Sequence, residues 1–464
     1  MQDRLLLLDP FQRFVQRGAP PQGRLAAERA DVTLPGRRMK ILMLSHVANN
    51  PNGGASRIYH MLSDALRARG HEVALYHAED AGVQGKGVGD LLKIRLVLPR
   101  LISAMGEKKN PSDFDVIMSS SGMAAPLFAR LRKKGGRRPL LVNHLHGLAV
   151  YDDLANRAED WIGNWSTSTM YRLITGRMQR RWDWQGIATS DLTVVQNRKD
   201  LDWVGARMPP GHELCLIPAA IHPELLAASM EQHDTPRDPD QLLWLATWEA
   251  RKGAAYVPRA FRKLRSVFPA AKLVVAGAKQ HADEIVAEFD PADRPNVKVM
   301  GRYDPAAQAT MLRQSSLFLF PSISEGFGLA LPEAMAFGVA AITTNMGFGG
   351  DWLSGVAQAA QAAAAAVEFG SEHPVARAIV AGSVPVPPAE TFDSHAGFGV
   401  QGIVAGSLVV AGRPSWLQEQ WSIHPTAQLQ HDADELQTAG ATVVAIGRDG
   451  THLGIIAVAD TVKP

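Results

Sequence analysis

The segment Ser324-Glu-Gly-Phe-Gly-Leu-Ala-Leu-Pro-Glu333 joins a glycine-rich loop to two glutamates, Glu325 and Glu333. It follows the apolar run LFLFPS at 317–322, which is typical of a buried strand, and it leads into a helical pattern. Glu325 should therefore lie at the carboxyl end of a strand, the edge at which open α/β sheets bind ligands. The amides of residues 326–328 can point there at an anion or a hydroxyl group. This stretch predicts a ligand site on an α/β fold.

Apolar runs alternate with helical patterns on both sides of this segment. Strands are expected at 40–47, 71–77, 115–119, 139–144, 191–196 and 213–220, and, beyond a polar linker at 231–240, at 242–248, 272–277, 296–301, 317–322 and 340–345. Helices are expected at 58–69, 91–105, 124–134, 256–268, 306–314 and 331–337. Such alternation is the signature of doubly wound parallel sheets, so we predict an α/β fold with two tandem Rossmann-like domains facing a cleft.

The pattern changes after Trp352. An alanine-rich helix is expected at 356–367 and a second helix at 374–381, followed by Val/Ile-rich strands. The stretch 443–460 reads as a hairpin with its turn at 448–451, so this region is predicted to be α+β with a mainly antiparallel sheet. The predicted divisions are a poorly ordered tail at 1–38, domains at 39–230 and 241–353, and a third domain at 356–464.

Composition narrows the class of protein. The chain has 464 residues, of which 46% are hydrophobic, and no stretch approaches the roughly 20 consecutive apolar residues that span a bilayer. Its single cysteine, Cys215, cannot form an internal disulfide, and we expect a cytoplasmic protein. Charge is uneven: residues 91–181 hold 16 Lys/Arg against 7 Asp/Glu, whereas residues 356–464 hold 4 against 10. This difference in charge indicates that the two segments have separate origins.

The pattern Ser-Glu-Gly-Phe-Gly-Leu-x-x-x-Glu-Ala-Met-Ala-x-Gly resembles the nucleotide-sugar site of a large family of retaining glycosyltransferases with two Rossmann-like domains (family 4 / group 1 type), and the resemblance covers 39–352. It implies that Glu325 contacts the donor sugar as a catalytic residue and that Glu333 contacts the nucleotide ribose. Judged by their spacing alone, Glu325 would be an ordinary loop residue and Glu333 an ordinary residue on a helix surface, neither with a role in binding. The chain looks C-terminally truncated relative to this family.

Further stretches match the same family. Arg251 and Lys252 follow a strand, where the family places a cation against the donor diphosphate, although the common form has an arginine where Thr247 stands. Gly53 and Gly54 resemble its glycine loop, and a strand-end histidine of the family, which touches the donor sugar, corresponds to His146 in preference to His144. The implied set of donor-binding and catalytic residues is Gly53, Gly54, His146, Arg251, Lys252, Glu325, Gly326, Phe327, Gly328 and Glu333. As an alternative, Arg251 and Lys252 belong to a solvated helix start, and His146 has only a structural role.

Ser371-Glu-His-Pro374 opens a second resemblance, which covers 356–464 and points to the nucleotide-binding domain of heavy-metal-transporting P-type ATPases. The motifs Gly397-Phe-Gly399-Val400 and Ala411-Gly412-Arg413 follow in family order. The resemblance implies an ATP site formed by Glu368, His373, Gly397, Gly399, Val400 and Gly412. The Asp-Lys-Thr-Gly-Thr segment of the pumps, whose aspartate accepts the phosphoryl group, is absent from the sequence. We therefore expect ATP binding without hydrolysis, and no ion transport.

Two functions stay open at this point. One is transfer of a sugar, with retention, from a nucleotide-diphosphate sugar to a lipid-linked or polysaccharide acceptor, without a required metal. The other is a non-catalytic ATP-binding fragment in a chimeric chain, natural or otherwise. The basic region 91–181, which includes Lys93, Arg95 and Arg100, suits peripheral contact with an anionic membrane, and a solvated basic face is the alternative. Aromatic residues are too sparse there to predict nucleic-acid binding.

Overall fold

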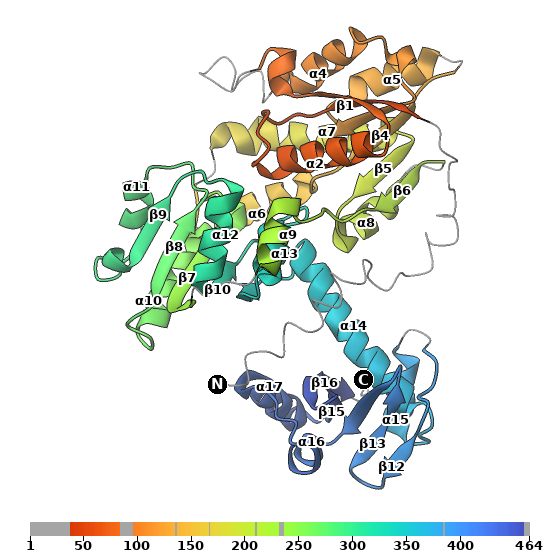
Figure 1. Cartoon of the computed structure of the whole chain (residues 1–464), viewed down its shortest axis with the longest axis vertical. Coiled ribbons are helices and arrows are strands. Elements are labelled where there is room, and N and C mark those ends of the chain that lie inside the picture. Colours follow the sequence, from red (N-terminus) through yellow and green to blue (C-terminus); the bar gives the residue numbers. More distant parts are fainter. Residues whose placement is uncertain are drawn as a thin grey trace. The chain divides into compact units, whose positions relative to one another are not determined.

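The computed structural model describes residues 38–83, 96–134, 137–166, 168–208, 211–231, 236–383 and 386–458 (Figure 1). The tail expected at 1–38 lies outside these residues except for Arg38. The described residues divide into two compact units at Asp351/Trp352. The unit before the division contains two parallel sheets, each with its own helices, which we call the first and second lobes; the unit after it contains one antiparallel sheet.

The first lobe is built on a six-stranded parallel sheet in the order β2-β1-β3-β4-β5-β6. Its strands are β1 (Lys40–Leu44), β2 (Glu72–Tyr76), β3 (Val116–Ser120), β4 (Leu140–His144), β5 (Leu192–Val195) and β6 (Glu213–Leu216). All except β3 lie within the predicted strands, and β3 extends one residue past its predicted end at 119. β6 stops four residues earlier than expected, before Pro218, which has no N–H for the ladder.

Helices cover both faces of this sheet, as in doubly wound folds. They are α2 (Gly54–Ala68), α4 (Leu98–Glu107), α5 (Ala125–Lys134), α6 (Ala149–Trp161), α7 (Gly176–Thr189), α8 (Arg198–Gly205) and α9 (Pro223–Met230). On one face, α4, α5 and α7 bury Ile102, Phe128 and Trp182 against strand residues such as Leu42. On the other face, α2 packs Tyr59 against Met43. Part of the helix predicted at 91–105 falls on residues that the structure does not describe.

The second lobe has a five-stranded parallel sheet in the order β11-β10-β7-β8-β9. Its strands are β7 (Asp238–Leu245), β8 (Lys272–Ala276), β9 (Val297–Met300), β10 (Ser315–Phe320) and β11 (Ala340–Thr343), and its helices are α10 (Val257–Arg265), α11 (Ala282–Ala287), α12 (Pro305–Gln314) and α13 (Ala330–Ala336). Trp244, Trp248, Phe261 and Phe289 form an aromatic core between sheet and helices.

The chain between the lobes differs from the linker that we predicted at 231–240. Asp238 already belongs to β7, where it lies opposite Ser315 of β10 and its carboxylate accepts a hydrogen bond from Lys272, 2.8 Å away. The helix α9, which lies within the predicted first domain at 39–230, contacts the second lobe through Arg313, which donates to the carbonyl of Ala228. The polar composition of 231–240 concealed the start of β7, because strand ends are also polar.

The unit after the division is an antiparallel sheet in the order β12-β13-β14-β15-β16. It contains α15 (Pro374–Ala381), β12 (Asp393–His395), β13 (Gly399–Val404), β14 (Ser407–Gly412), α16 (Pro414–Trp421), α17 (Ala427–Thr438), β15 (Thr442–Arg448) and β16 (Thr451–Val458). The predicted hairpin is confirmed, since Arg448 lies opposite Thr451. Its two turn residues, Asp449 and Gly450, both have positive φ, as a type I′ turn requires.

The predicted start of the alanine-rich helix at residue 356 is wrong. The helix α14 extends without interruption over Phe348–Glu368, and so passes through the predicted boundary at 353–356. Its first turns contain Gly349 and Gly350, which have poor intrinsic helix propensity, and they hid the helix from a sequence reading. Gly350 is favoured by its surroundings, because a Cβ there would lie 2.7 Å from the side chain of Asn345.

An edge of the second sheet is apolar and exposed. β11 pairs with β10 on one side, and three of its four residues are exposed, with Ile342 at 57%. An uncovered apolar strand edge is a site for association with other chains.

Candidate active site between the two parallel sheets

The strand order of the second sheet places two motif loops next to each other. The order reverses between β7 and β10, and ligands of open α/β sheets bind at the carboxyl ends of the strands at such a reversal. The segment after β7 carries Arg251 and Lys252, and the loop after β10 carries Glu325. The loops are bonded together, since the carbonyl of Arg251 accepts from the amides of Ile323 and Ser324. The topology therefore brings together the residues that the sequence selected separately.

Glu325 and Lys252 form a buried ion pair at this point. The Nζ of Lys252 lies 2.5 Å from Oε1 of Glu325, and the hydroxyl of Ser322 donates to the same oxygen at 2.8 Å. Burial raises the pKa of Glu325, but the charges of Lys252 and Arg251 outweigh it, so the net pKa lies below its ordinary value. Burial lowers the pKa of Lys252, and Glu325 opposes that shift. The pair supplies one ionised acceptor and one cation.

Arg251 borders a cavity of about 450 Å³. Most of its wall comes from the first lobe, and the second lobe contributes the turn at 249–251. The lining side chains carry carboxylates, amides and hydroxyls, with Trp165 as the apolar element: Asp152, Asn156, Trp165, Ser166, Ser168, Tyr171, Gln179, Glu249 and Arg251. Burial lowers the pKa of Arg251, but the carboxylates of Asp152, Glu325 and Glu249 raise it further, so the guanidinium stays charged.

Glu333 lies on α13 with its side chain 1% exposed, and it is already engaged by two partners. Arg57 of α2, in the first lobe, donates to Oε1, and Gln308 of α12 donates to Oε2 at 2.5 Å. Burial raises the pKa of Glu333 and outweighs the opposing charge of Arg57. Gly53 and Gly54 are the N-cap and the first residue of α2, and Arg57 follows three residues later in the first turn of the helix. The glycine loop thus leads into a helix that ties the two lobes together.

His146 lies at the carboxyl end of β4 in a group of aromatic rings. Its ring centroid is 4.5 Å from that of His144 and 5.3 Å from that of Tyr59. Burial lowers the pKa of His146 well below its ordinary value, and neighbouring His144 and His46 contribute to the shift. Its Nε2 is buried and has no hydrogen-bond partner among the described residues. The ring is therefore neutral near pH 7 and has one nitrogen available.

Gly326 brings the two lobes into backbone contact beside His146. A Cβ on Gly326 would lie 2.2 Å from the carbonyl oxygen of His146 and 2.6 Å from the amide nitrogen of Gly147. The amide of Asn197 in the first lobe donates to the carbonyl of Gly326. The hydroxyl of Ser324 adds a bond to Asp152 at 2.7 Å. No side chain larger than glycine's fits at position 326 in this arrangement.

The other two loop residues have structural surroundings. The ring of Phe327 is 7% exposed and packs against Phe348, with ring centroids 5.4 Å apart. Gly328 has φ of 82°, and a Cβ there would meet the ring of Phe320 at 2.7 Å. Both residues therefore shape the loop that carries Glu325, and only their backbone groups can face a ligand.

In the C-terminal unit, the structure separates the expected ATP-site residues into buried and exposed positions. Glu368 ends α14 and is 7% exposed; burial raises its pKa to about 7, and no described residue donates to its carboxylate. His373 is exposed, and its Nδ1 accepts from the amide of Val375 as the N-cap of α15. Gly397 has φ of 81° with open space around it.

The remaining three residues lie in the strands. Gly399 and Gly412 are opposite each other in β13 and β14. A Cβ on either would lie 2.7 Å from the ring of Trp416, so both glycines permit tight packing of that indole. Val400 is buried at 4% in the core. Gly399, Val400 and Gly412 therefore have a structural role in the sheet in addition to any contact with a nucleotide.

Sequence reasoning missed Arg57, Gln308 and Asn197. Arg57 stands three residues after the glycine pair, on the same side of the first helical turn, and this spacing is a signal that could have found it. Gln308 and Asn197 offer no such signal, because only the three-dimensional fold brings them to Glu333 and Gly326.

Comparison with known proteins supports both resemblances. Residues 52–225 match the family model described as Glycosyltransferase Family 4, and residues 227–354 match the model described as Glycosyl transferases group 1. Sucrose-phosphate synthase from Thermosynechococcus elongatus has a similar structure, with a TM-score of 0.51 and 17% sequence identity, over 67% of this chain and 82% of that one. This likeness shows a shared fold of two facing Rossmann-like domains.

The C-terminal part matches other proteins. The probable copper-exporting P-type ATPase V of Mycobacterium tuberculosis is 45% identical over 104 residues, which are 22% of this chain and 13% of that protein. The N-domain of HMA8, a copper-transporting P-type ATPase, is 29% identical, with a TM-score of 0.19, over 22% of this chain and 85% of that one. In the described residues, no helix has the length and apolar character needed to cross a membrane. The chain thus matches glycosyltransferase family models over 52–225 and 227–354, and the segment after them is similar to part of the copper-exporting P-type ATPases.

Proposed function

We propose that the two lobes transfer a sugar from a nucleotide-diphosphate sugar to an acceptor with retention of anomeric configuration. The observation that carries the proposal is the convergence of Arg251, Lys252 and Glu325 where the strand order of the second sheet reverses. A buried cation pair suits a diphosphate, and an ionised carboxylate suits sugar hydroxyls.

Each residue has a role that its charge state supports. As the glycosidic bond of the donor breaks, negative charge develops on the leaving diphosphate, and Lys252 and Arg251 stabilise it. Glu325 holds the donor sugar by accepting hydrogen bonds from its hydroxyls. In neutral His146, Nδ1 accepts a hydrogen bond from Gln196, so Nε2, which has no partner among the described residues, donates to a further hydroxyl. The acceptor hydroxyl attacks from the face that the diphosphate leaves, and its proton passes to the departing phosphate oxygen. These cations take the charge that a metal carries in other transferases, so we propose that no metal is required.

Glu333 requires an exchange of partners before it can bind a ribose. Both of its oxygens are occupied, by Arg57 and by Gln308. If Gln308 leaves Glu333, one hydrogen bond from a neutral donor is lost, which costs little free energy. If Arg57 leaves Glu333, a buried cation loses its partner, which costs more. We therefore propose that the ribose replaces Gln308 and that Arg57 stays in place.

The acceptor is proposed to enter the cavity beside Arg251. Its amides, carboxylates and hydroxyls match a hydroxyl-rich molecule, and Trp165 offers an apolar ring face of the kind that sugars pack against. This lining suits the sugar part of a lipid-linked or polysaccharide acceptor.

Isothermal calorimetry with uridine- and guanosine-diphosphate sugars tests the proposal. We expect Glu325→Gln and Lys252→Met to weaken binding of the preferred donor by about 10- to 100-fold each, as for loss of a charged hydrogen bond. Lys263→Met, which removes an exposed cation of α10, is the matched control and should bind normally. If no donor binds, or if all three variants behave like the parent, the transferase proposal fails.

A second function is favoured by Glu368. Its buried carboxyl group has no donor among the described residues, and its pKa of about 7 lets it donate or accept near neutral pH. An adenine edge presents both kinds of group, so we propose ATP binding by Glu368 and His373, with Gly397 leaving space for the nucleotide. We expect ATP to bind the full chain and His373→Ala to weaken it. Arg377→Ala, one helical turn away and also exposed, is the control.

A further inference from the structure

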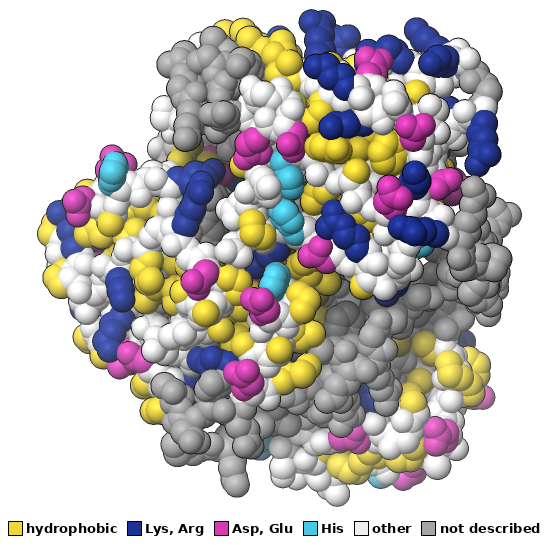
Figure 2. Space-filling model, turned by 45° about the horizontal axis from the view of Figure 1, so that its top comes forward, with side chains coloured by type: hydrophobic (Ala, Val, Ile, Leu, Met, Phe, Trp, Pro, Cys, Tyr) yellow, Lys and Arg dark blue, Asp and Glu magenta, His cyan; other side chains and the backbone are white. Residues whose placement is uncertain are grey.

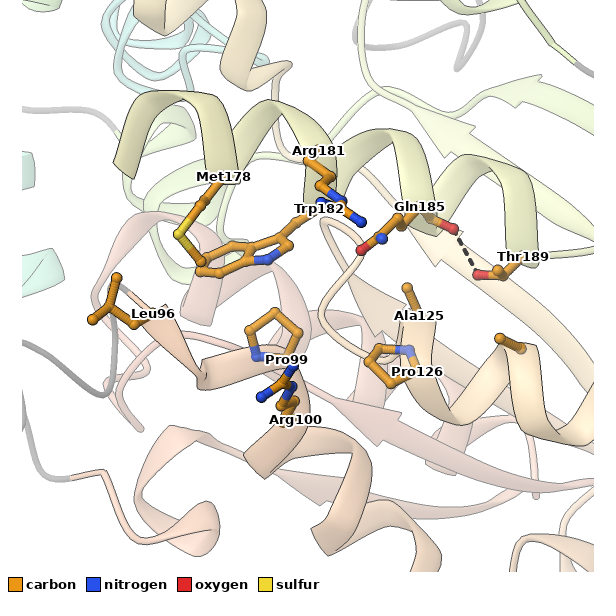
Figure 3. Close-up of a pocket in the computed structure, with 11 residues that line it drawn as sticks. Leu96, Pro99, Arg100, Ala125, Pro126, Met178, Arg181, Trp182, Gln185 and Thr189 are labelled. Atoms are coloured by element: carbon orange, nitrogen blue, oxygen red, sulfur yellow. Dashed lines mark hydrogen bonds between the residues drawn. The ribbon is translucent and has the colours of Figure 1, made fainter. Parts of the chain in front are cut away.

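A groove outside the candidate active site lies between three helices of the first lobe, α4, α5 and α7. It has a volume of about 480 Å³. Most of its lining is apolar, and Figure 3 shows the indole of Trp182 between Met178 on one side and Pro99 on the other. The lining residues are Leu96, Pro99, Arg100, Ala125, Pro126, Ala129, Met178, Arg181, Trp182, Gln185 and Thr189. Ile174, one turn before Met178, is 47% exposed and extends the apolar surface.

Two arginines accompany this apolar groove. Arg100 comes from α4 and Arg181 from α7, and both are exposed (Figure 3). Among the residues that the structure describes, neither guanidinium has a hydrogen-bond or ion-pair partner. Three further arginines of this lobe are engaged, since Arg132 and Arg138 bind Asp191 and Arg130 binds Glu107. Arg100 and Arg181 are thus available to an external anion.

The surroundings of the groove are positive. The helices α4, α5 and α7 hold eight Lys/Arg against two acidic residues. Of the two acids, Glu107 pairs with Arg130, and Asp183 is buried, with its pKa raised by burial to about 8. Figure 2 shows Lys and Arg side chains gathered around hydrophobic ones near the top of the molecule, the end at which Figure 1 labels α4 and α5.

We propose that this groove binds one acyl chain of an anionic phospholipid, with the lipid phosphate held by Arg100 and Arg181. Planar guanidinium groups bind phosphate in a bidentate manner, and the chain would lie over Met178, Trp182 and Pro99. The combination of an apolar channel with unpaired cations fits an amphiphile better than a soluble anion, which would leave the channel empty. An inserted chain together with a basic surface gives stable attachment where either alone is marginal.

The groove would place the expected membrane contact at one site of the first lobe. Lipid binding at this site does not depend on binding of the sugar donor. Of the basic region 91–181 that the sequence offered for such a contact, Arg100 and Arg181 are the two cations that line the groove, so the proposal rests on them. Lys93 and Arg95 lie outside the described residues.

Vesicle co-sedimentation of the full chain tests the charge requirement. We expect binding to vesicles of phosphatidylcholine mixed equally with phosphatidylglycerol, and much less to phosphatidylcholine alone. The double variant Arg100→Ser/Arg181→Ser should bind about thirtyfold more weakly, because each surface cation contributes about 1 kcal/mol. The matched control is Arg259→Ser/Lys263→Ser, which removes the same charge from exposed positions of α10 in the second lobe. Equal losses in the two double variants, or no binding by the parent, would overturn the proposal.

Variants that keep the charge of the protein test whether the groove holds an acyl chain. Ala129→Phe places a ring in the groove, and we expect it to lower vesicle binding while the donor affinity of the active site stays that of the parent. Phosphatidylglycerol with brominated acyl chains should quench part of the tryptophan fluorescence, and Trp182→Phe should remove that part. If Ala129→Phe binds vesicles like the parent, or if quenching is unchanged in Trp182→Phe, the attachment is electrostatic alone and the groove does not hold a chain.

Discussion

Replacing Gly326 by alanine should force the two lobes apart. The added Cβ would lie 2.2 Å from the carbonyl oxygen of His146, whereas real Cβ contacts essentially never fall below 3.0 Å. The opposing atoms are backbone, so a rotamer change cannot relieve the clash, and one lobe must move by about 0.8 Å relative to the other. This movement also strains the bond from Asn197 to the carbonyl of Gly326.

The cost can be estimated from these two effects. Overpacking of this kind costs about 1–3 kcal/mol, and loss of one hydrogen bond adds about 1 kcal/mol. We expect Gly326→Ala to lower the free energy of unfolding of the two-lobe unit by about 2–4 kcal/mol. Donor affinity should fall as well, because Glu325 and His146 approach the donor from different lobes.

Urea unfolding followed by tryptophan fluorescence measures the first effect, and calorimetry with the preferred nucleotide sugar measures the second. Gly301→Ala is the matched control in the same lobe, since a Cβ there meets nothing within 4 Å. If Gly326→Ala and Gly301→Ala unfold at the same urea concentration and bind the donor equally, the backbone contact between the lobes is not as described.

Three other predictions concern single groups. Arg57→Ala should destabilise the two-lobe unit by about 3–5 kcal/mol at pH 7, because Glu333 keeps a buried charge without a cation; burial raises the pKa of Glu333, so urea titrations should show a smaller loss as the pH is lowered and this carboxylate is protonated. Burial raises the pKa of Glu368 from 4.5 to about 7, so the C-terminal unit should lose about 1–3 kcal/mol of stability as pH rises from 5 to 8, after allowance for solvent screening; Glu368→Gln should flatten this dependence in thermal unfolding. Gly399→Ala should lower the melting temperature of the C-terminal unit alone, because its Cβ would lie 2.4 Å from the carbonyl of Ala411, and hydrogen exchange resolved by segment would detect a wider effect if this is wrong.

Local patterns predicted most of the secondary structure. The helix at 374–381 agrees residue for residue with α15, because Pro374 at its first position and His373 as its cap define the start. The hairpin at the C-terminus was predictable because Asp449-Gly450 accepts the positive φ values of a tight turn. Predicted strands were often longer than observed ones, as strand ends leave the ladder where the chain turns.

The candidate site was predictable to the extent that its motifs are contiguous. Glu325, Lys252 and His146 were selected as candidates from their loops, and the parallel topology explains why separate loops meet. The spacing of Arg57 after the glycine pair marks it as a candidate, but its pairing with Glu333 depends on the contact between the lobes. Gln308 has no such mark, because its hydrogen bond to Glu333 joins α12 to α13 only in the folded chain. Long-range pairs of this kind leave no periodic signal in a sequence.

The helix α14 explains how the two resemblances share one chain. At its start, Phe348 is 8% exposed and its amide donates to the carbonyl of Phe327, so this end belongs to the core of the second lobe. At its other end, residues 363–367 are buried in the core of the C-terminal unit. Between these ends, the described residues at 357–359 are exposed. Each core therefore contains one end of the helix, and no hydrophobic cluster among the described residues includes both ends. The stability and ligand binding of each unit can for this reason be measured separately in the same full-length chain.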